Sequence, residues 1–152
     1  MNQLDNKKYR IALVILAVIG FLDSLFLSVE HFRGVLPPCS VAFKCDLVTT
    51  SAYSVMFGVP VSYLGLLYYL ALFIGAILLY DKSENPALRK KFVLGLRVVS
   101  FLGLLFSARF TYIQGAILNA WCTYCIASAL TTLLFFIAIH LENQQSKKIN
   151  SV

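Results

Sequence analysis

The sequence has few charged residues, few glycines and few prolines. Charged residues make up 13% of its 152 residues, whereas about a quarter is usual in a soluble domain. Only 8 glycines and 4 prolines are present, which excludes a fibrous protein, and a 59% hydrophobic content excludes both a disordered chain and a small secreted disulfide scaffold. These absences leave an integral membrane protein.

Four long apolar runs account for that composition, at residues 11–29, 59–80, 92–118 and 121–141. Each reaches the ~20 residues that a helix needs to cross a bilayer. None alternates polar and apolar residues, which excludes a transmembrane barrel. The first run is too long for the apolar part of a signal peptide and has no cleavage site after it. The sequence therefore predicts an all-α bundle of four transmembrane helices, forming a single domain over residues 1–152.

The basic residues predict the orientation of this bundle. Lys7, Lys8 and Arg10 precede the first run, four basic residues lie within 82–91, and two follow the fourth run. The connection at residues 30–58 carries only Arg33 and Lys44. Since lysine and arginine gather on the cytoplasmic side, both termini are expected in the cytoplasm and the 30–58 loop outside. Clusters that flank apolar runs are not a nucleic-acid surface, so no nucleic-acid partner is expected.

Two charged residues lie inside the apolar runs. Asp23 is about 20 Å and Arg109 about 27 Å from the cytoplasmic end of their helices, at a rise of 1.5 Å per residue. A charge at this depth needs a partner. The similar depths predict an ion pair between the two, acting as a structural link between the first and third helices.

The four cysteines all fall on the predicted outer side. Cys39 and Cys45 lie in the 30–58 loop, and Cys122 and Cys125 open the fourth run. This is the side on which disulfides form and persist. Four cysteines allow two disulfides in three pairings, which sequence alone does not distinguish.

The two cysteine pairs differ in their surroundings. Cys122 and Cys125 form a C-x-x-C at the start of a helix, where the helix dipole favours a thiolate with a lowered pKa. Cys39 and Cys45 lie in a loop with two prolines, which is free to swing. One mobile and one fixed pair can pass electrons inward from a soluble partner by thiol–disulfide exchange. The alternatives are two purely structural disulfides, and a Cys₄ zinc site, which the C-x₅-C spacing disfavours.

Such a relay needs an electron acceptor. The eight glycines contain no G-x-G-x-x-G, so no dinucleotide site is expected. His31 and His140 fall on opposite sides of the membrane and cannot hold a haem together. A lipid-soluble quinone remains, by elimination.

Three segments resemble the vitamin K epoxide reductase family. They are CSVAFKCD from Cys39, the stretch from Ser51 to Ser62 that includes SAYS and FGVPVS, and WCTYC from Trp121. The likeness runs from the first helix to the last, and is to the bacterial branch that oxidises thiols. The unrelated Dsb-type oxidases carry their C-x-x-C in the first outward loop, whereas here it opens the last helix.

The resemblance implies roles for the cysteines. It implies a four-helix bundle around a ubiquinone or menaquinone in the bacterial inner membrane, capped by the 30–58 loop with a short helix. Cys122 and Cys125 would be the active-site pair, with Cys125 nearest the quinone. Cys45 would be the shuttle and Cys39 would meet the partner. Because no thioredoxin-like domain is fused to the predicted bundle, that partner would be a separate thioredoxin-like protein.

The resemblance also implies a quinone site, for which the candidates are Ser51, Tyr53, Ser54, Phe57, Tyr124 and Ser128. The animal enzymes have a tyrosine four residues after the second active-site cysteine, where this chain has Ala129. Quinone reduction is therefore expected ahead of epoxide reduction. Whether disulfide formation or the reduction of a quinone or of vitamin K epoxide is the physiological direction stays open.

Overall fold

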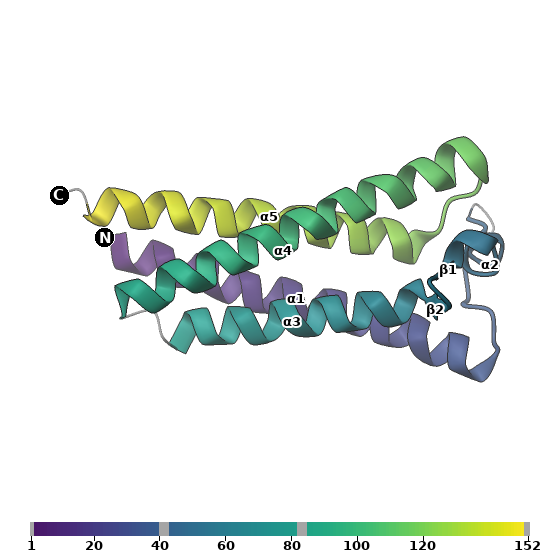
Figure 1. The fold of residues 1–152 in the computed structure, drawn as a ribbon, viewed down its shortest axis with the longest axis horizontal. Helices are drawn as coiled ribbons and strands as arrows, with labels where there is room; N and C mark the ends of the chain where they lie inside the picture. Colours follow the sequence, from purple (N-terminus) through teal and green to yellow (C-terminus); the bar gives the residue numbers. More distant parts are fainter. Residues whose placement is uncertain (1, 40–42, 82–84, 151–152) are drawn as a thin grey trace.

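The computed structural model describes residues 2–39, 43–81 and 85–150. Part of the first cysteine motif (40–42) and the first basic residue of the 82–91 cluster lie outside them. Four long helices run side by side (Figure 1), and each is long and apolar enough to cross a membrane. They are α1 (Asn2–Arg33), α3 (Val61–Asp81), α4 (Pro86–Tyr112) and α5 (Thr123–Asn150). The predicted all-α, four-helix membrane architecture is confirmed.

Helix α4 extends beyond the start of the third apolar run, because the residues before that run form a helix cap. The side chain of Asn85 caps α4 and accepts hydrogen bonds from the amides of Ala87 and Leu88, at 3.1 and 3.4 Å. Pro86 then fits the first helical position, where no amide donor is needed. At its other end α4 widens into a five-residue π-helix, η2 (Ile113–Ile117). Helix α4 therefore begins at Pro86, before the apolar run that starts at residue 92.

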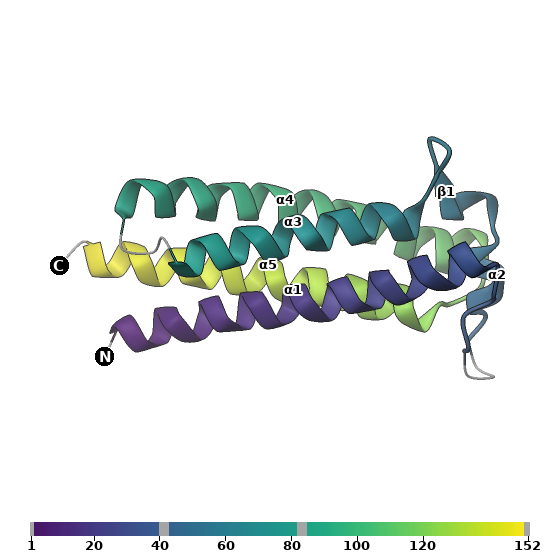
Figure 2. The same cartoon turned by 90° about the horizontal axis from the view of Figure 1, so that it is seen from below.

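The order of the helices around the bundle decides which residues meet. Helix α1 packs on α3 and α5, and α4 packs on the same two helices from the other side. Both termini lie at one end of the bundle and the short helix α2 at the other (Figures 1 and 2). Glycines permit close approach, as at Gly20, where the ring of Tyr69 lies against the backbone of α1.

The predicted ion pair between Asp23 and Arg109 is wrong. Helices α1 and α4 are not packing neighbours, since α3 and α5 separate them. The guanidinium of Arg109 lies 4.0 Å from the sulfur of Met56. Asp23 instead lines a cavity, and its Oδ2 has no hydrogen-bond partner among the described residues. Similar depth did not bring the two side chains together, because depth in the membrane does not determine which helices pack against each other.

A different ion pair links two helices near the termini. The guanidinium of Arg10 on α1 donates to Oε1 of Glu142 on α5 from Nη2 at 3.1 Å and from Nε at 3.3 Å. The Glu142 side chain is fully buried and that of Arg10 is 12% exposed. This contact closes the end of the bundle opposite the cysteines.

Apolar side chains face both inward and outward along the helices. A buried cluster fills the interior, with Leu13, Leu72, Leu79, Phe135 and Ile139 among its fully buried members. Large apolar side chains such as Leu22, Leu67, Leu94, Leu102 and Leu134 are exposed on the outer surface. A helix that is apolar all round is typical of a membrane span.

The connection from α1 to α3 folds over the end of the bundle. It contains α2 (Cys45–Thr49), a 3₁₀ turn η1 (Ala52–Ser54), and a hairpin of β1 (Val55–Met56) and β2 (Val59–Pro60). Val55 pairs with Pro60, and Met56 with Val59. Phe57 and Gly58 form the turn, with φ of +53° and +79°. The hairpin projects from the bundle in Figure 2.

Candidate functional site

The loop cysteines form a disulfide between Cys39 and Cys45. Cys45 is the first residue of α2 and is fully buried, whereas Cys39 is only partly buried. The Sγ of Cys39 lies 4.0 Å from the hydroxyl of Thr123, the first residue of α5. The disulfide thus reaches from a partly accessible sulfur to a buried one.

Two hydrogen bonds hold this loop against the start of α5. The amide of Lys44 donates to the carbonyl oxygen of Trp121 at 3.0 Å. The hydroxyl of Tyr124 donates to the carbonyl oxygen of Pro38 at 2.9 Å. On the loop side the bonded residues, Lys44 and Pro38, directly precede Cys45 and Cys39. On the other side Trp121 directly precedes Cys122, and Tyr124 lies within the C-x-x-C. As a result Cys45 and Cys122 share one small buried cluster with Val48 and Ala120.

Cys122 precedes α5 and caps it, one position before the helix starts. Its carbonyl accepts the first helical bond, from the amide of Ile126 at 3.0 Å. Its own amide donates to Oε1 of the buried Gln114 at 2.8 Å. Cys122 and Cys125 are free thiols in this structure.

The surroundings of Cys122 favour its thiolate. A hydrogen bond from the Cys125 thiol lowers the pKa of Cys122 to about 7, assisted by the amides of Cys125 and Tyr124 and opposed by burial. The lowered pKa favours the thiolate, which is the form that takes part in thiol–disulfide exchange. The C-x-x-C at a helix start predicts one thiol with a lowered pKa, and in the structure the pKa of Cys122 is lowered.

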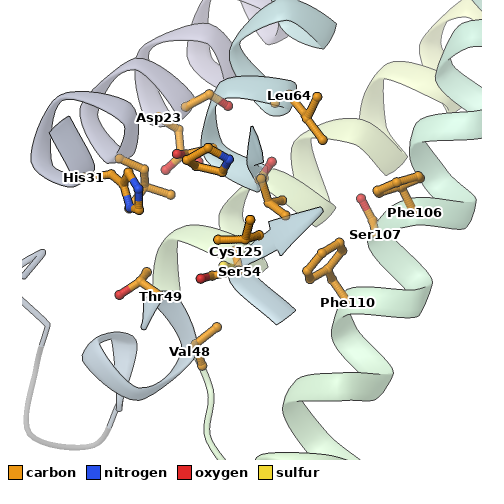
Figure 3. Close-up of a pocket in the computed structure, with 18 of the residues that line it drawn as sticks. Asp23, His31, Val48, Thr49, Ser54, Leu64, Phe106, Ser107, Phe110 and Cys125 are labelled. Atoms are coloured by element: carbon orange, nitrogen blue, oxygen red, sulfur yellow. The ribbon is translucent and has the colours of Figure 1, made fainter. Parts of the chain in front are cut away.

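A cavity of about 940 Å³ opens beneath the loop, between the helices. Cys125 lies at its wall, with Asp23 of α1 on another side and Phe106 and Phe110 of α4 on a third (Figure 3). Residues of α2, such as Val48, close it toward the loop. The lining is mostly apolar, and the volume is in the range of small-molecule sites.

The cavity takes in three of the six predicted quinone-site residues. Ser51, Ser54 and Ser128 line it, and Tyr53, Phe57 and Tyr124 do not. Phe57 is 97% exposed at the tip of the hairpin, and Tyr124 holds the loop. Residues that sequence reasoning did not select also line the cavity, namely Tyr68, Tyr69, Gln114 and Thr132.

A sequence signal for these missed residues did exist. Each is a hydrogen-bonding side chain within an apolar run, and such residues in membrane helices face the bundle interior and bind a partner. The hydroxyl of Tyr69 does so, lying 2.9 Å from both the Ser128 and the Thr132 hydroxyl. Among the polar residues in the apolar runs, only the charged Asp23 and Arg109 were predicted to need a partner on this ground.

Comparison with known proteins agrees with this arrangement. A sequence model described as the vitamin K epoxide reductase family matches residues 11–139, which is most of the chain. No curated protein sequence gives a significant match. The matched region extends from the first helix into the last and contains all four cysteines. The chain therefore belongs to the vitamin K epoxide reductase family, and its apolar helices and cysteines are those of a membrane oxidoreductase.

Proposed function

We propose that this protein is a membrane thiol oxidoreductase that generates disulfides and delivers the electrons to a quinone. One observation carries the proposal. The partly accessible Cys39 is joined to Cys45, Cys45 shares a buried cluster with Cys122, and Cys125 lies at the wall of the cavity. The four sulfurs thus form a path from the loop surface to an apolar site between membrane helices.

The cavity fits a quinone in size and polarity. Its volume of about 940 Å³ accommodates a substituted ring with part of an isoprenoid tail. Its mostly apolar lining suits a lipid-soluble molecule. When bound there, a quinone supplies the capacity to take up two electrons and two protons.

The relay begins at the loop disulfide. A thiolate of a reduced thioredoxin-like partner attacks Cys39, the Cys39–Cys45 bond breaks, and a mixed disulfide forms. The partner's second thiol releases it as a disulfide, so the partner loses two electrons and two protons. Cys39 and Cys45 are left as thiols.

The second exchange carries these electrons inward. Cys45 attacks Cys122 of an oxidised Cys122–Cys125 pair, so the Cys45–Cys122 bond forms and Cys125 leaves as a thiolate. Cys39 then attacks Cys45, restoring the loop disulfide and releasing Cys122. The product has a closed loop pair and an open inner pair, as in the present structure.

The last step returns the inner pair to its disulfide. Cys125 and Cys122 give up two electrons and two protons as their sulfurs join, which matches what reduction to the quinol requires. Thiol oxidation and quinone reduction are therefore balanced over one turnover.

The proposed location is a bacterial cytoplasmic membrane with the cysteines on its outer face. Lys7, Lys8, Arg10 and the basic residues of 89–91 belong to the end of the bundle that holds both termini. Positive residues favour the cytoplasmic side. The opposite end, with the loop and α2, would then meet an extracytoplasmic thioredoxin-like protein.

The test is quinone-dependent thiol oxidation by the purified chain in detergent. A reduced thioredoxin-like protein and a soluble quinone analogue are added, and quinone absorbance is followed. We expect turnover that needs all three components and is lost in Cys125→Ala. A chain that oxidises no thiol with either a ubiquinone or a menaquinone analogue, and whose disulfide resists mild reductant, would overturn the proposal.

A further inference from the structure

The hairpin of β1 and β2 has an apolar tip that the rest of the chain leaves uncovered. Phe57 is almost fully exposed at the turn, and Val55 and Val59 are exposed on the two strands. No charged residue occurs between Asp46 and Asp81, so the hairpin carries no charge of its own. An exposed patch made only of apolar residues marks a surface that binds something apolar.

The backbone at the tip is unfavourable for a phenylalanine. Phe57 and Gly58 both have positive φ, as a type I′ turn requires. Glycine and asparagine suit these positions, and a bulky side chain there is uncommon. Such a conformation persists where other interactions compensate for it. Because the described chain does not cover the ring of Phe57, those interactions must lie outside it.

The hairpin lies at the level where α3 enters the membrane. Its second strand ends at Pro60, and the membrane-spanning part of α3 begins at Val61. In Figure 2 the hairpin projects sideways from the long axis of the bundle, whereas α2 lies over the end of the bundle. For a bundle that crosses a bilayer, the sideways direction leads into the surrounding lipid. The tip is therefore placed to meet lipid at the membrane surface.

A cation without a carboxylate partner lies beside the hairpin. Arg109 is exposed on α4, and its Nη1 lies 4.0 Å from the sulfur of Met56. Within the described residues, no carboxylate is at ion-pair distance from Arg109. Arg109 lies about 12 Å before the end of its span at Ile117, at a rise of 1.5 Å per residue. An arginine at this depth extends its guanidinium toward the headgroups and needs an anion there.

We propose that the hairpin and Arg109 form a phospholipid-binding site in the leaflet at the cysteine end of the bundle. The guanidinium of Arg109 binds the headgroup phosphate, because its planar set of N–H donors matches phosphate oxygens. The tip around Phe57 inserts among the acyl chains near the glycerol. Since Val55 and Pro60 also line the cavity, the bound lipid holds one wall of the cavity in place. The inference does not depend on the proposed redox function.

The first measurement asks whether the tip enters lipid. The full chain with Phe57→Trp and Trp121→Phe has a single tryptophan, at the tip. It is reconstituted into vesicles of phosphatidylcholine and phosphatidylglycerol whose acyl chains are brominated near the glycerol. We expect the bromines to quench most of its fluorescence. Leu47→Trp with Trp121→Phe is the matched control, because Leu47 is exposed on α2 over the end of the bundle (Figure 1), and it should keep most of its fluorescence.

The second measurement asks whether Arg109 binds the phosphate. The chain with the tryptophan at the tip, in an uncharged detergent, is titrated with brominated short-chain phosphatidylglycerol. We expect saturable quenching, and Arg109→Gln should weaken the apparent affinity about tenfold, the effect of losing a hydrogen bond to a charged group. Arg33→Gln removes an arginine that already lies 3.9 Å from Glu30 and should match the parent. Diacylglycerol with the same chains, which lacks the phosphate, should bind the parent about tenfold more weakly as well.

The outcomes decide between lipid and other occupants. Equal quenching of the tryptophans introduced at Phe57 and Leu47 overturns the inference, and so do equal affinities of Arg109→Gln and the parent. Inorganic phosphate that displaces the brominated lipid would identify a free anion as the ligand, which also overturns it. Melting curves in detergent check that each variant is folded. If Arg109→Gln does not fold, the comparison of phosphatidylglycerol with diacylglycerol on the parent decides the matter, and equal affinities for the two overturn the inference.

Discussion

The amide of Lys44 donates to the carbonyl oxygen of Trp121 across 3.0 Å, and this bond brings the two cysteine pairs together. Each partner directly precedes a cysteine, Cys45 in the loop and Cys122 at the start of α5. Both sulfurs are fully buried in the same small cluster. The proposed exchange between the pairs would therefore need a local shift of the loop and no rearrangement of the bundle.

Removal of Cys39 should trap the exchange between the pairs. In Cys39→Ala, Cys45 can attack Cys122, but the thiol that would carry the exchange forward is gone, so the product is resolved only by back-attack of Cys125. We expect a Cys45–Cys122 disulfide to accumulate, identified by peptide mapping under non-reducing conditions. Cys39→Ala with Cys122→Ala is the control that cannot form it. Recovery of only Cys122–Cys125 from the single variant would count against the shuttle role of Cys45.

The thiolate of Cys122 should titrate near pH 7. Its pKa is lowered from 9.0 to about 7 chiefly by the Cys125 thiol. A lowered pKa means that the thiolate, and with it exchange at this sulfur, grows as the pH rises through 7 rather than through 9. In a chain with Cys39 and Cys45 replaced by alanine, ultraviolet absorbance of the thiolate measures this midpoint.

A matched pair of variants tests the cause of that shift. Cys125→Ala removes the donor and should move the midpoint of Cys122 up toward 9.0. Cys125→Ser keeps a hydroxyl donor and should leave the midpoint closer to 7. Equal midpoints in the two variants would show that another group sets the pKa.

Gln114 should be needed to hold Cys122 in place. Its Oε1 accepts from the Cys122 amide at 2.8 Å, and its side chain is buried. Gln114→Ala leaves that amide unpaired, and we expect a loss of about 1–3 kcal/mol in unfolding free energy together with slower turnover. Gln114→Glu retains the acceptor oxygen and should be the milder change. Unfolding and quinone reduction are measured on the same preparations, and an alanine variant as stable and active as the original would exclude this role.

Removal of one charge of the Arg10–Glu142 ion pair should destabilise the bundle more than removal of both. Because Glu142 is fully buried, Arg10→Met leaves its charge uncompensated and should cost on the order of 3 kcal/mol. Arg10→Met with Glu142→Leu removes both charges and should recover most of that loss. Thermal unfolding in detergent gives the comparison. If the double variant is no more stable than Arg10→Met, the pair does not act by mutual charge compensation.

The sequence by itself determined the architecture and the grouping of the cysteines. Four apolar runs were enough for four helices, because backbone groups in lipid have few other ways to be satisfied. The spacing of Cys122 and Cys125 placed both sulfurs at one helix start, and Cys39 and Cys45 fell in the same loop. These features depend on composition and on residues close together in the chain.

Only the tertiary structure decided which side chains meet. Asp23 and Arg109 lie at similar depths, yet α3 and α5 separate their two helices. Asp23 therefore does not pair with Arg109, and it lines the cavity instead. The hydroxyl of Tyr69 on α3 lies beside the Ser128 and Thr132 hydroxyls of α5, at 2.9 Å from each. Helix adjacency and hydrogen-bond satisfaction arise from contacts between residues far apart in the chain, and no local pattern in the sequence encodes them.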